Sequence, residues 1–314
     1  MAITLEPIRA VREMPCAQHL CFTVMNVELR HLRALAAIGN EGTITGAAAV
    51  LHLSQPALSR TLEQLESRLG ARLVERTTRS LALTEAGARL LTHANRILTQ
   101  VDDALAEVKA GPRALRVGFA WAALGRHTVP LLRGWRRARP DAELRVFRPD
   151  DPEGALRRGE IDVAFVRSPA TPDRELASAD LYLEPRVAAV SEDHPFARAL
   201  AVRLDDLADR PVAICATATS TSVTLWPAEH RPDALDVANA DEWLTAIATG
   251  DAVGVTTEAT AHSHPHPGVR YVPVTDAEPV AVRLVWPRSA THPATDAFRE
   301  HARVLLREAS RPER

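Results

Sequence analysis

The sequence is poor in cysteine, and the few that occur form no pattern. Its 314 residues include three cysteines: Cys16, Cys21 and Cys215. An odd number at irregular spacing argues against a disulfide framework and fits a reducing cytosol. Long apolar runs are also missing, because none approaches the ~18 residues that a membrane-spanning helix needs. These shortages predict a cytoplasmic protein with no membrane partner.

The first two dozen residues lack the features of a secretory signal peptide. Their apolar run at residues 20–25 is short and late, and no small-residue cleavage site precedes a mature start. We expect residues 1–24 to be a disordered N-terminal extension. Met25 is as good a candidate for the biological start as Met1, because the first periodic helix begins just after it.

Net charge, lysine and enzyme motifs are scarce as well. The formal net charge of -2 gives no sign of a nucleic-acid partner, although an acidic domain would mask a small basic module. Lys109 is the only lysine, which we attribute to a GC-rich genome rather than to function. The sequence holds no nucleophile elbow, phosphate-binding loop, Rossmann fingerprint or metalloprotease motif. We therefore expect neither an enzyme nor a cofactor.

Three short helices are predicted near the N-terminus. Apolar residues recur at helical spacing over residues 29–38. Thr43 or Thr45 is the expected N-cap of a second helix, and Ser54 is that of a third, which tolerates Pro56 in its first turn. The third helix has a buried stripe and a closing glycine, namely Leu58, Leu62, Leu65, Leu69 and Gly70.

The third helix has the form of one that enters a DNA major groove. Its leucines face inward, which leaves a polar outer face, and Gln and Arg on that face suit bidentate contacts with adenine and guanine edges. Two short extended segments come next, joined by a positive turn at residues 76–79 that would act as a wing on the adjacent backbone or minor groove. The predicted DNA-binding residues are Thr43, Ser54, Gln55, Pro56, Ser59, Arg60, Arg76, Thr77, Thr78 and Arg79.

A long helix is predicted over residues 84–110, where Gly111-Pro112 ends it. Its apolar residues recur at steps of four or three residues, at Leu90, Ala94, Ile97, Val101, Leu105 and Val108. Such a seam implies a partner helix, so we expect a homodimer through residues 84–110. The alternative is a core helix of one globular domain. We favour the dimer because the break at 111–112 would isolate the helix from the domain beyond it.

After residue 113 strands alternate with helices, a pattern typical of βαβ units and a parallel sheet. Strands are expected at residues 115–119, 144–147, 161–166, 186–190, 212–215, 252–255, 269–274 and 280–286. Helices are expected at residues 129–138, 150–158, 204–207, 241–248 and 294–308. The predicted fold is thus an all-α winged helix-turn-helix with a long linker helix, followed by an α/β domain.

Residues 28–87 contain a characteristic set of segments, namely Glu28-Leu-Arg-His-Leu32, residues 42–51, Leu53-Ser-Gln-Pro-Ala-Leu-Ser-Arg60, 65–66, 69–70, 73–76 and 83–87. In these segments the chain strongly resembles the LysR-type transcriptional regulators of bacteria. The run from Ser54 to Arg60 is highly specific, and weaker matches continue at residues 156–163 and at His194-Pro195. The resemblance implies a ligand-responsive, sequence-specific regulator. Such a protein binds double-stranded operator DNA and a small-molecule effector, and typically forms a homotetramer.

The resemblance also implies an effector-binding domain of two α/β lobes, similar to periplasmic binding proteins. The expected domains are 25–83 for DNA binding, 84–112 for the linker and dimerisation helix, and 113–314 for effector binding. Within the last, lobe I is expected at 113–166 and 269–314, and lobe II at 167–268. Parallel sheets bind ligands beyond the carboxyl ends of their strands. The loops there contain the candidate effector contacts Trp121, Ala122, Ala123, Arg167, Ser168, Thr217, Thr219 and Ser220.

Two of these candidates have competing interpretations. Arg167 would bind an effector carboxylate, or it is an exposed or hinge-stabilising arginine. The loop at residues 121–123 carries Trp-Ala-Ala where the family often has a hydroxyl residue. Because of that departure, no relative's effector is transferred to this chain.

Three other interpretations are weaker. An oxidant sensor built on Cys215 would need a resolving thiol, and the other cysteines lie in the N-terminal extension. His262, His264 and His266 offer imidazoles to a metal, but at alternate spacing with no nearby cysteine or carboxylate, so no metal site is expected. The third is a small-molecule-binding protein or enzyme fused to a DNA-binding module.

Overall fold

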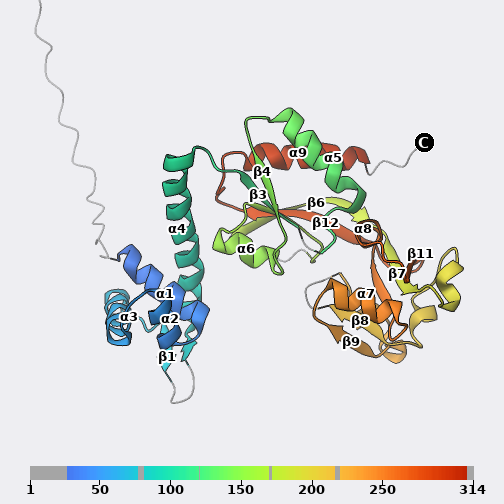
Figure 1. The fold of residues 1–314 in the computed structure, drawn as a ribbon, viewed down its shortest axis with the longest axis horizontal. Coiled ribbons are helices and arrows are strands. Elements are labelled where there is room, and N and C mark those ends of the chain that lie inside the picture. Colours follow the sequence, from blue (N-terminus) through green and yellow to red (C-terminus); the bar gives the residue numbers. More distant parts are fainter. Residues whose placement is uncertain (1–26, 77–80, 120, 170–171, 216–219, 310–314) are drawn as a thin grey trace, which may run out of the picture. The chain divides into compact units, whose positions relative to one another are not determined.

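The computed structural model describes residues 27–76, 81–119, 121–169, 172–215 and 220–309. The chain divides into two compact units, Met1–Ala88 and Arg89–Arg314. The first unit is helical with a small β-hairpin, and the described part of the second holds three groups of paired strands with helices around them (Figure 1). The predicted order of a helical module followed by an α/β half is confirmed.

The first unit contains the three predicted helices, a hairpin and the start of a long helix. Its elements are α1 (Leu29–Glu41), α2 (Ile44–Val50), α3 (Gln55–Leu69), β1 (Val74–Arg76), β2 (Leu81–Leu83) and the first turn of α4 (Glu85–Ala110). Of the two candidates for the N-cap of α2, Thr43 and Thr45, the structure has Thr43. The predicted N-cap of α3, Ser54, is confirmed. Gly42 and Gly70 end α1 and α3 in the left-handed conformation that glycine favours.

A leucine and alanine core holds these helices together. Leu35, Leu58 and Leu65 are fully buried, and Ala47 of α2 is small enough to let neighbouring helices approach closely. Gly87 in α4 faces the backbone before β1, where an added Cβ would lie 2.0 Å from the carbonyl oxygen of Leu73. Only glycine therefore lets the first turn of α4 pack against that segment.

In the second unit, lobe I is a five-stranded sheet with strand order β4-β3-β5-β12-β6. Its strands are β3 (Leu115–Phe119), β4 (Leu144–Phe147), β5 (Val163–Val166), β6 (Leu176–Glu184) and β12 (Val280–Pro287). The first three strands are parallel, and β12 runs antiparallel to β5 and β6. Helices α5 (Thr128–Ala138) and α9 (Thr295–Ala309) cover one face, and α6 (Pro152–Arg158) covers the other (Figure 1).

Lobe II has a three-stranded sheet, order β10-β7-β11, and a parallel pair, β8 and β9. Its strands are β7 (Arg186–Ser191), β8 (Val212–Cys215), β9 (Ala234–Val237), β10 (Gly254–Thr257) and β11 (Val269–Pro273). Helices α7 (Ala240–Ala248) and α8 (Glu258–Ser263) pack beside them. Short 3-10 turns complete the unit: η1 (Gly125–His127) in lobe I, and η2 (Pro195–Arg198), η3 (Asp205–Leu207), η4 (Val223–Leu225) and η5 (Ala228–His230) in lobe II.

The predicted lobe boundaries are wrong at both crossings. The segment after Arg167 does not enter lobe II, because β6 pairs with β12 along eight positions and extends the lobe I sheet. The strand after residue 268 does not return to lobe I, because β11 pairs with β7. The chain therefore crosses at Pro185 and again between Pro273 and Val280. Lobe I comprises residues 113–184 and 280–309, and lobe II comprises 185–274.

The long helix α4 matches its predicted span. The expectation that Gly111-Pro112 isolates it from the α/β domain is wrong, because Asp103 forms ion pairs with Arg113 and Arg116 beyond the break. Among the described residues no helix is both long and apolar enough to cross a membrane.

Candidate functional site

Two predicted DNA-binding residues begin helices. The Thr43 hydroxyl accepts a hydrogen bond from the backbone N–H of Gly46 (3.1 Å), and the Ser54 hydroxyl accepts one from that of Ala57 (3.4 Å). Both side chains are exposed. Each cap satisfies a backbone donor that the first helical turn leaves open, so α2 and α3 begin at fixed points.

The outer face of α3 carries the remaining predicted base readers. Gln55, Pro56 and Arg60 are exposed, and Ser59 is half-buried. The Gln55 side-chain amide donates to the hydroxyl of Thr45 in α2, and Arg60 Nε donates to the Pro56 carbonyl (3.2 Å). The structure thus brings these four residues together on one polar face, opposite the buried leucines.

The hairpin after α3 forms the base of the predicted wing. Strands β1 and β2 pair antiparallel, with Arg76 opposite Leu81. Thr77, Thr78 and Arg79, the predicted wing residues between them, lie outside the described residues. Sequence reasoning missed the residue that links this hairpin to α3: Glu66 Oε1 accepts from the backbone N–H groups of Leu73 (2.7 Å) and Val74 (3.1 Å). Helix α3 and the hairpin are therefore fixed to each other by one carboxylate.

The predicted effector loop after β3 reaches from lobe I to lobe II. Trp121 (φ 26°) and Ala123 (φ 47°) adopt positive φ, a conformation that costs free energy in residues other than glycine. The carbonyl of Ala122 accepts a hydrogen bond from the Ser263 hydroxyl in α8 (3.1 Å). Gly125 lies so close to α8 that an added Cβ would be 2.7 Å from Ala259 Cα. The strained loop is therefore held by lobe II.

Trp121 packs into lobe II although it belongs to lobe I. Its ring lies edge-on to Trp243 (5.8 Å between centroids) and beside His264 (5.9 Å). Trp121 Nε1 and His264 Nδ1 are both buried and have no hydrogen-bond partner among the described atoms. Burial, reinforced by Arg148, lowers the pKa of His264 and so favours the neutral form of its imidazole. A donor and a ring nitrogen thus lie unpaired where the lobes meet.

Arg167 is already paired. Its Nε and Nη2 donate to the Glu184 carboxylate (2.6 and 3.1 Å), and Nη2 also donates to the carbonyl of Ala123 (2.8 Å). The side chains of Arg167 and Glu184 are 6% and 5% exposed. The geometry fits the hinge-stabilising interpretation, because an effector carboxylate would have to displace Glu184.

The other predicted effector contacts do not gather on this loop. The Ser168 hydroxyl donates to Glu153 (2.9 Å), and the Ser220 carbonyl accepts from Arg186 Nη1 (2.6 Å). Thr217 and Thr219 lie outside the described residues. No group of three or more His, Cys, Asp or Glu side chains that would hold a metal ion occurs in the described parts of the chain.

Sequence reasoning missed the neighbours of Arg167. Tyr182 lies on β6 with Glu184, and its ring packs in a T-shaped arrangement with that of His127 (5.3 Å between centroids). The Tyr182 hydroxyl is buried without a hydrogen-bond partner among the described atoms, and burial raises its pKa. Burial, reinforced by Arg126, lowers the pKa of His127. The run Leu181-Tyr182-Leu183 is a sequence signal that would have indicated a strand here.

Two family models match the chain. Residues 29–88 match the bacterial regulatory helix-turn-helix protein family of LysR type, and residues 110–307 match the LysR substrate binding domain. Together they cover residues 29–88 of the helical unit and most of the α/β unit.

Known proteins agree with the family models. The uncharacterised HTH-type transcriptional regulator YnfL of Escherichia coli K12 is 33% identical over 301 residues, which is 90% of this chain and all of that protein. The hca operon transcriptional activator HcaR of the same organism is 36% identical, over 54% of this chain and 59% of its own length. The LysR family regulator CbnR (TM-score 0.62, 22% identity, 89% of this chain and 99% of the other) shares the fold. The chain belongs to the LysR family of ligand-responsive transcriptional regulators, with a helix-turn-helix DNA-binding domain and a two-lobed α/β substrate-binding domain.

Proposed function

We propose that the N-terminal half of α3 reads operator DNA through Gln55, Pro56, Ser59 and Arg60. The observation that carries this proposal is the exposed polar face of α3, which stands opposite fully buried leucines and begins at a capped residue. A helix presented in this way fits a major groove. Thr43 and Ser54 contact phosphates from the two helix starts, and residues 76–79 supply the wing.

An electrophoretic mobility assay on the chain's own promoter region tests this proposal. Arg60→Ala is expected to weaken binding by about 1–3 kcal/mol if Arg60 reads a base. Arg137→Ala is the matched control, because Arg137 is equally exposed but lies in the other compact unit. No binding by the wild type at low salt, or equal affinities of the two variants, would contradict the proposal.

The effector site in this proposal lies where the loop of residues 121–123 meets lobe II. The unpaired Trp121 Nε1–H and His264 Nδ1 support it, because a ligand that lies there would supply the missing partners. Arg167 holds this loop by its bond to the Ala123 carbonyl instead of contacting the effector.

A thermal-shift screen of small organic acids and metabolites tests the effector site, since a ligand of the folded state raises the unfolding temperature. A compound that stabilises the wild type is then tested on Trp121→Ala. We expect the variant to lose most of the shift. An undiminished shift would place the effector elsewhere.

The oligomer in this proposal forms through the apolar seam of α4. Ile97, Leu105 and Val108 are 39%, 57% and 87% exposed in the single chain. Apolar residues that recur along one side of a helix and lie exposed mark a surface for a partner. A second copy would bury them in a dimer, and two dimers would form the homotetramer. Light scattering of Leu105→Glu is expected to give a smaller particle than the wild type.

A regulator that binds chromosomal DNA works in the cytoplasm and needs no catalytic centre, so we propose neither an enzymatic activity nor a membrane site. The oxidant-sensing alternative gains no support from the structure. Cys215 is buried in β8, whereas sensor thiols are solvent-accessible.

A further inference from the structure

We propose that His31, Arg68 and Glu28 form a polar junction that sets the tilt of α3 against α1, with His31 as a positioning residue for the reading of DNA. The contacts that make up the junction do not depend on the proposed function. Their consequence for DNA rests on the proposed reading of operator DNA by α3.

His31 is a polar residue at a core position. It lies in the first turn of α1 and is completely buried, on the same side of the helix as Leu35 and Ile38. Its Nδ1 accepts a hydrogen bond from the backbone N–H of Glu28, the N-cap of α1 (2.9 Å). Glutamate or glutamine usually has this role in a capping box. Because Nδ1 is an acceptor, the ring is neutral and its proton is on Nε2.

Arg68 of α3 covers one face of this ring. Its Nη1 lies 3.3 Å from Nδ1 and 3.2 Å from Nε2 of His31. An atom at nearly equal distances from both ring nitrogens lies over the ring, because in the ring plane it would collide with the carbon between them. The lone pair of Nδ1 already accepts from Glu28, and Nε2 carries the proton. The contact is therefore a guanidinium stacked on an imidazole rather than a hydrogen bond.

Glu28 completes the junction with its carboxylate. Its Oε1 lies 3.5 Å from Arg68 Nη1 and 2.8 Å from Nη2 of Arg30. The side chains in these two pairs are between 29% and 61% exposed, so each pair alone contributes little to stability. The buried ring differs, because it holds Glu28 through its backbone and Arg68 through the ring face. His31 is therefore the residue on which the geometry of the junction depends.

The C-terminal turns of α3 are held on two sides. Glu66 accepts hydrogen bonds from the backbone N–H groups of Leu73 and Val74, and Arg68 reaches α1. Two residues apart on a helix means a rotation of about 200°, so these two side chains leave α3 in opposite directions. The end of α3 is thus fixed between the hairpin and the start of α1.

This fixed end is remote from the predicted base readers. Gln55 and Arg60 lie in the first two turns of α3, and Arg68 lies in the last turn. A helix of 15 residues is about 22 Å long, so a tilt of about 3° at one end moves the other end by about 1 Å. A binding side chain must be placed within about 0.5 Å of its productive position. The buried leucines hold α3 by non-directional burial, whereas the stacked and hydrogen-bonded contacts at His31 fix its tilt.

His31→Leu tests the junction on DNA. Leucine keeps an apolar side chain of similar size at the buried position, but it neither accepts from Glu28 nor offers a ring to Arg68. We expect the affinity for the chain's own promoter fragment, relative to a scrambled fragment, to fall at least about fivefold. Binding of the scrambled fragment should not change, because phosphate contacts carry no sequence information. Fluorescence anisotropy measures both affinities.

His31→Gln should rescue the ratio. Glutamine at this position of a capping box accepts the N–H of Glu28, and its planar amide lies where the ring was, so the ratio should stay within about threefold of the wild type. Ile38→Val is the matched control. Ile38 is buried on the same side of α1, and the loss of its methylene lowers stability but leaves the junction in place. Its ratio should equal that of the wild type.

A double variant tests whether His31 and Arg68 act through one contact. His31→Leu combined with Arg68→Met should lose less specificity than the product of the two single losses, because the first change already removes the stacked pair. Losses that multiply, or a ratio of His31→Leu equal to that of Ile38→Val, would overturn the junction.

Hydrogen exchange separates the junction from the proposed function. In the full-length protein without DNA, the amides in the last turn of α3 should exchange at least about fivefold faster in His31→Leu than in His31→Gln or Ile38→Val. Equal exchange in the three variants would overturn the junction, whatever the DNA measurements give. Faster exchange in His31→Leu, together with a wild type that shows no preference for its promoter, would contradict the proposed function and leave the junction standing.

Discussion

The two compact units place arginine in different environments. In the helical unit Arg60 is exposed on α3, and its one hydrogen bond in the described structure is to a carbonyl of its own helix. In the α/β unit Arg113, Arg167 and Arg283 are largely buried and donate to carboxylates or backbone carbonyls. The same side chain thus binds DNA in one unit of our account and maintains architecture in the other. Burial, not residue type, distinguishes the two uses.

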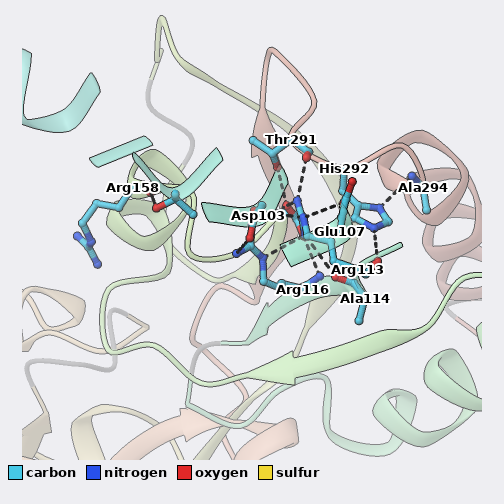
Figure 2. A network of polar contacts seen from close by, with 11 residues as sticks. Asp103, Glu107, Arg113, Ala114, Arg116, Arg158, Thr291, His292 and Ala294 are labelled. Carbon is cyan, nitrogen blue, oxygen red and sulfur yellow. Dashed lines mark hydrogen bonds and ion pairs between the residues drawn. The ribbon is translucent and has the colours of Figure 1, made fainter. Parts of the chain in front are cut away.

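The largest expected effect concerns Asp162, whose buried carboxylate accepts hydrogen bonds from Arg113 in the polar network that Figure 2 shows. Asp162→Ala leaves Arg113 without its main partner, and breaking a buried pair in this way typically costs about 3–5 kcal/mol. The free energy of unfolding from urea titration should fall by that amount. Arg60→Ala should change it by less than about 0.5 kcal/mol. Similar losses for both variants would remove the distinction between buried and exposed charge.

Weakening the pair between Arg167 and Glu184 should also lower the free energy of unfolding, but by less than the loss of Asp162 does. Glu184→Gln keeps the shape and a carbonyl acceptor while it removes the charge, so we expect a loss of about 2–3 kcal/mol, within the range for hydrogen bonds to charged groups. Denaturant titration would measure it. A more stable variant would mean that the pair is retained for a reason other than stability.

Lowering the pH should remove the contribution of Asp162 to the free energy of unfolding. Burial alone would raise the pKa of this carboxyl, but the hydrogen bonds from Arg113, Thr291 and Arg116 outweigh burial. Its pKa is lower in the folded than in the unfolded chain, so its stabilisation is fully present above the unfolded value and is lost as the pH falls below it. Between about pH 4 and pH 2 the free energy of unfolding should therefore fall more steeply for the wild type than for Asp162→Asn. Asp150→Asn, at an exposed position, should retain the wild-type slope.

The smallest effect is expected at the start of α3. Ser54→Ala removes the hydroxyl that accepts from Ala57, and loss of such a cap costs about 1 kcal/mol. Thermal unfolding monitored by circular dichroism would measure the change. Ser54→Asp should restore the stability, because aspartate also caps helices. A failure of the aspartate variant to do so would indicate that the hydroxyl does not act as a cap.

The elements with strong local signals were predictable from sequence. Leucine periodicity and caps predicted α3, and the seam predicted α4, because both depend on neighbours within one or two turns. Strand β6 was missed because its partner β12 lies about a hundred residues away and its own burial pattern is irregular. The first predicted lobe boundary was wrong for the same reason, because β6 belongs to the lobe I sheet.

The candidate site residues were also predictable only where the signal lies within one helix or strand. The polar face of α3 was predictable since one helix carries it. The partner of Arg167 was not, because Glu184 ends the strand that sequence reasoning missed. The contact of Trp121 with Trp243 joins two lobes, and no spacing along the chain encodes it.

The central claim, that the outer face of α3 reads sequence, is tested most directly by a specificity ratio. The affinities of wild type and Arg60→Ala are measured by fluorescence anisotropy for the chain's own promoter fragment and for a scrambled fragment at one salt concentration. The account predicts a ratio of at least about 10³ for the wild type and a ratio about tenfold lower for Arg60→Ala, with little change on the scrambled DNA. Equal ratios for the two proteins would contradict it.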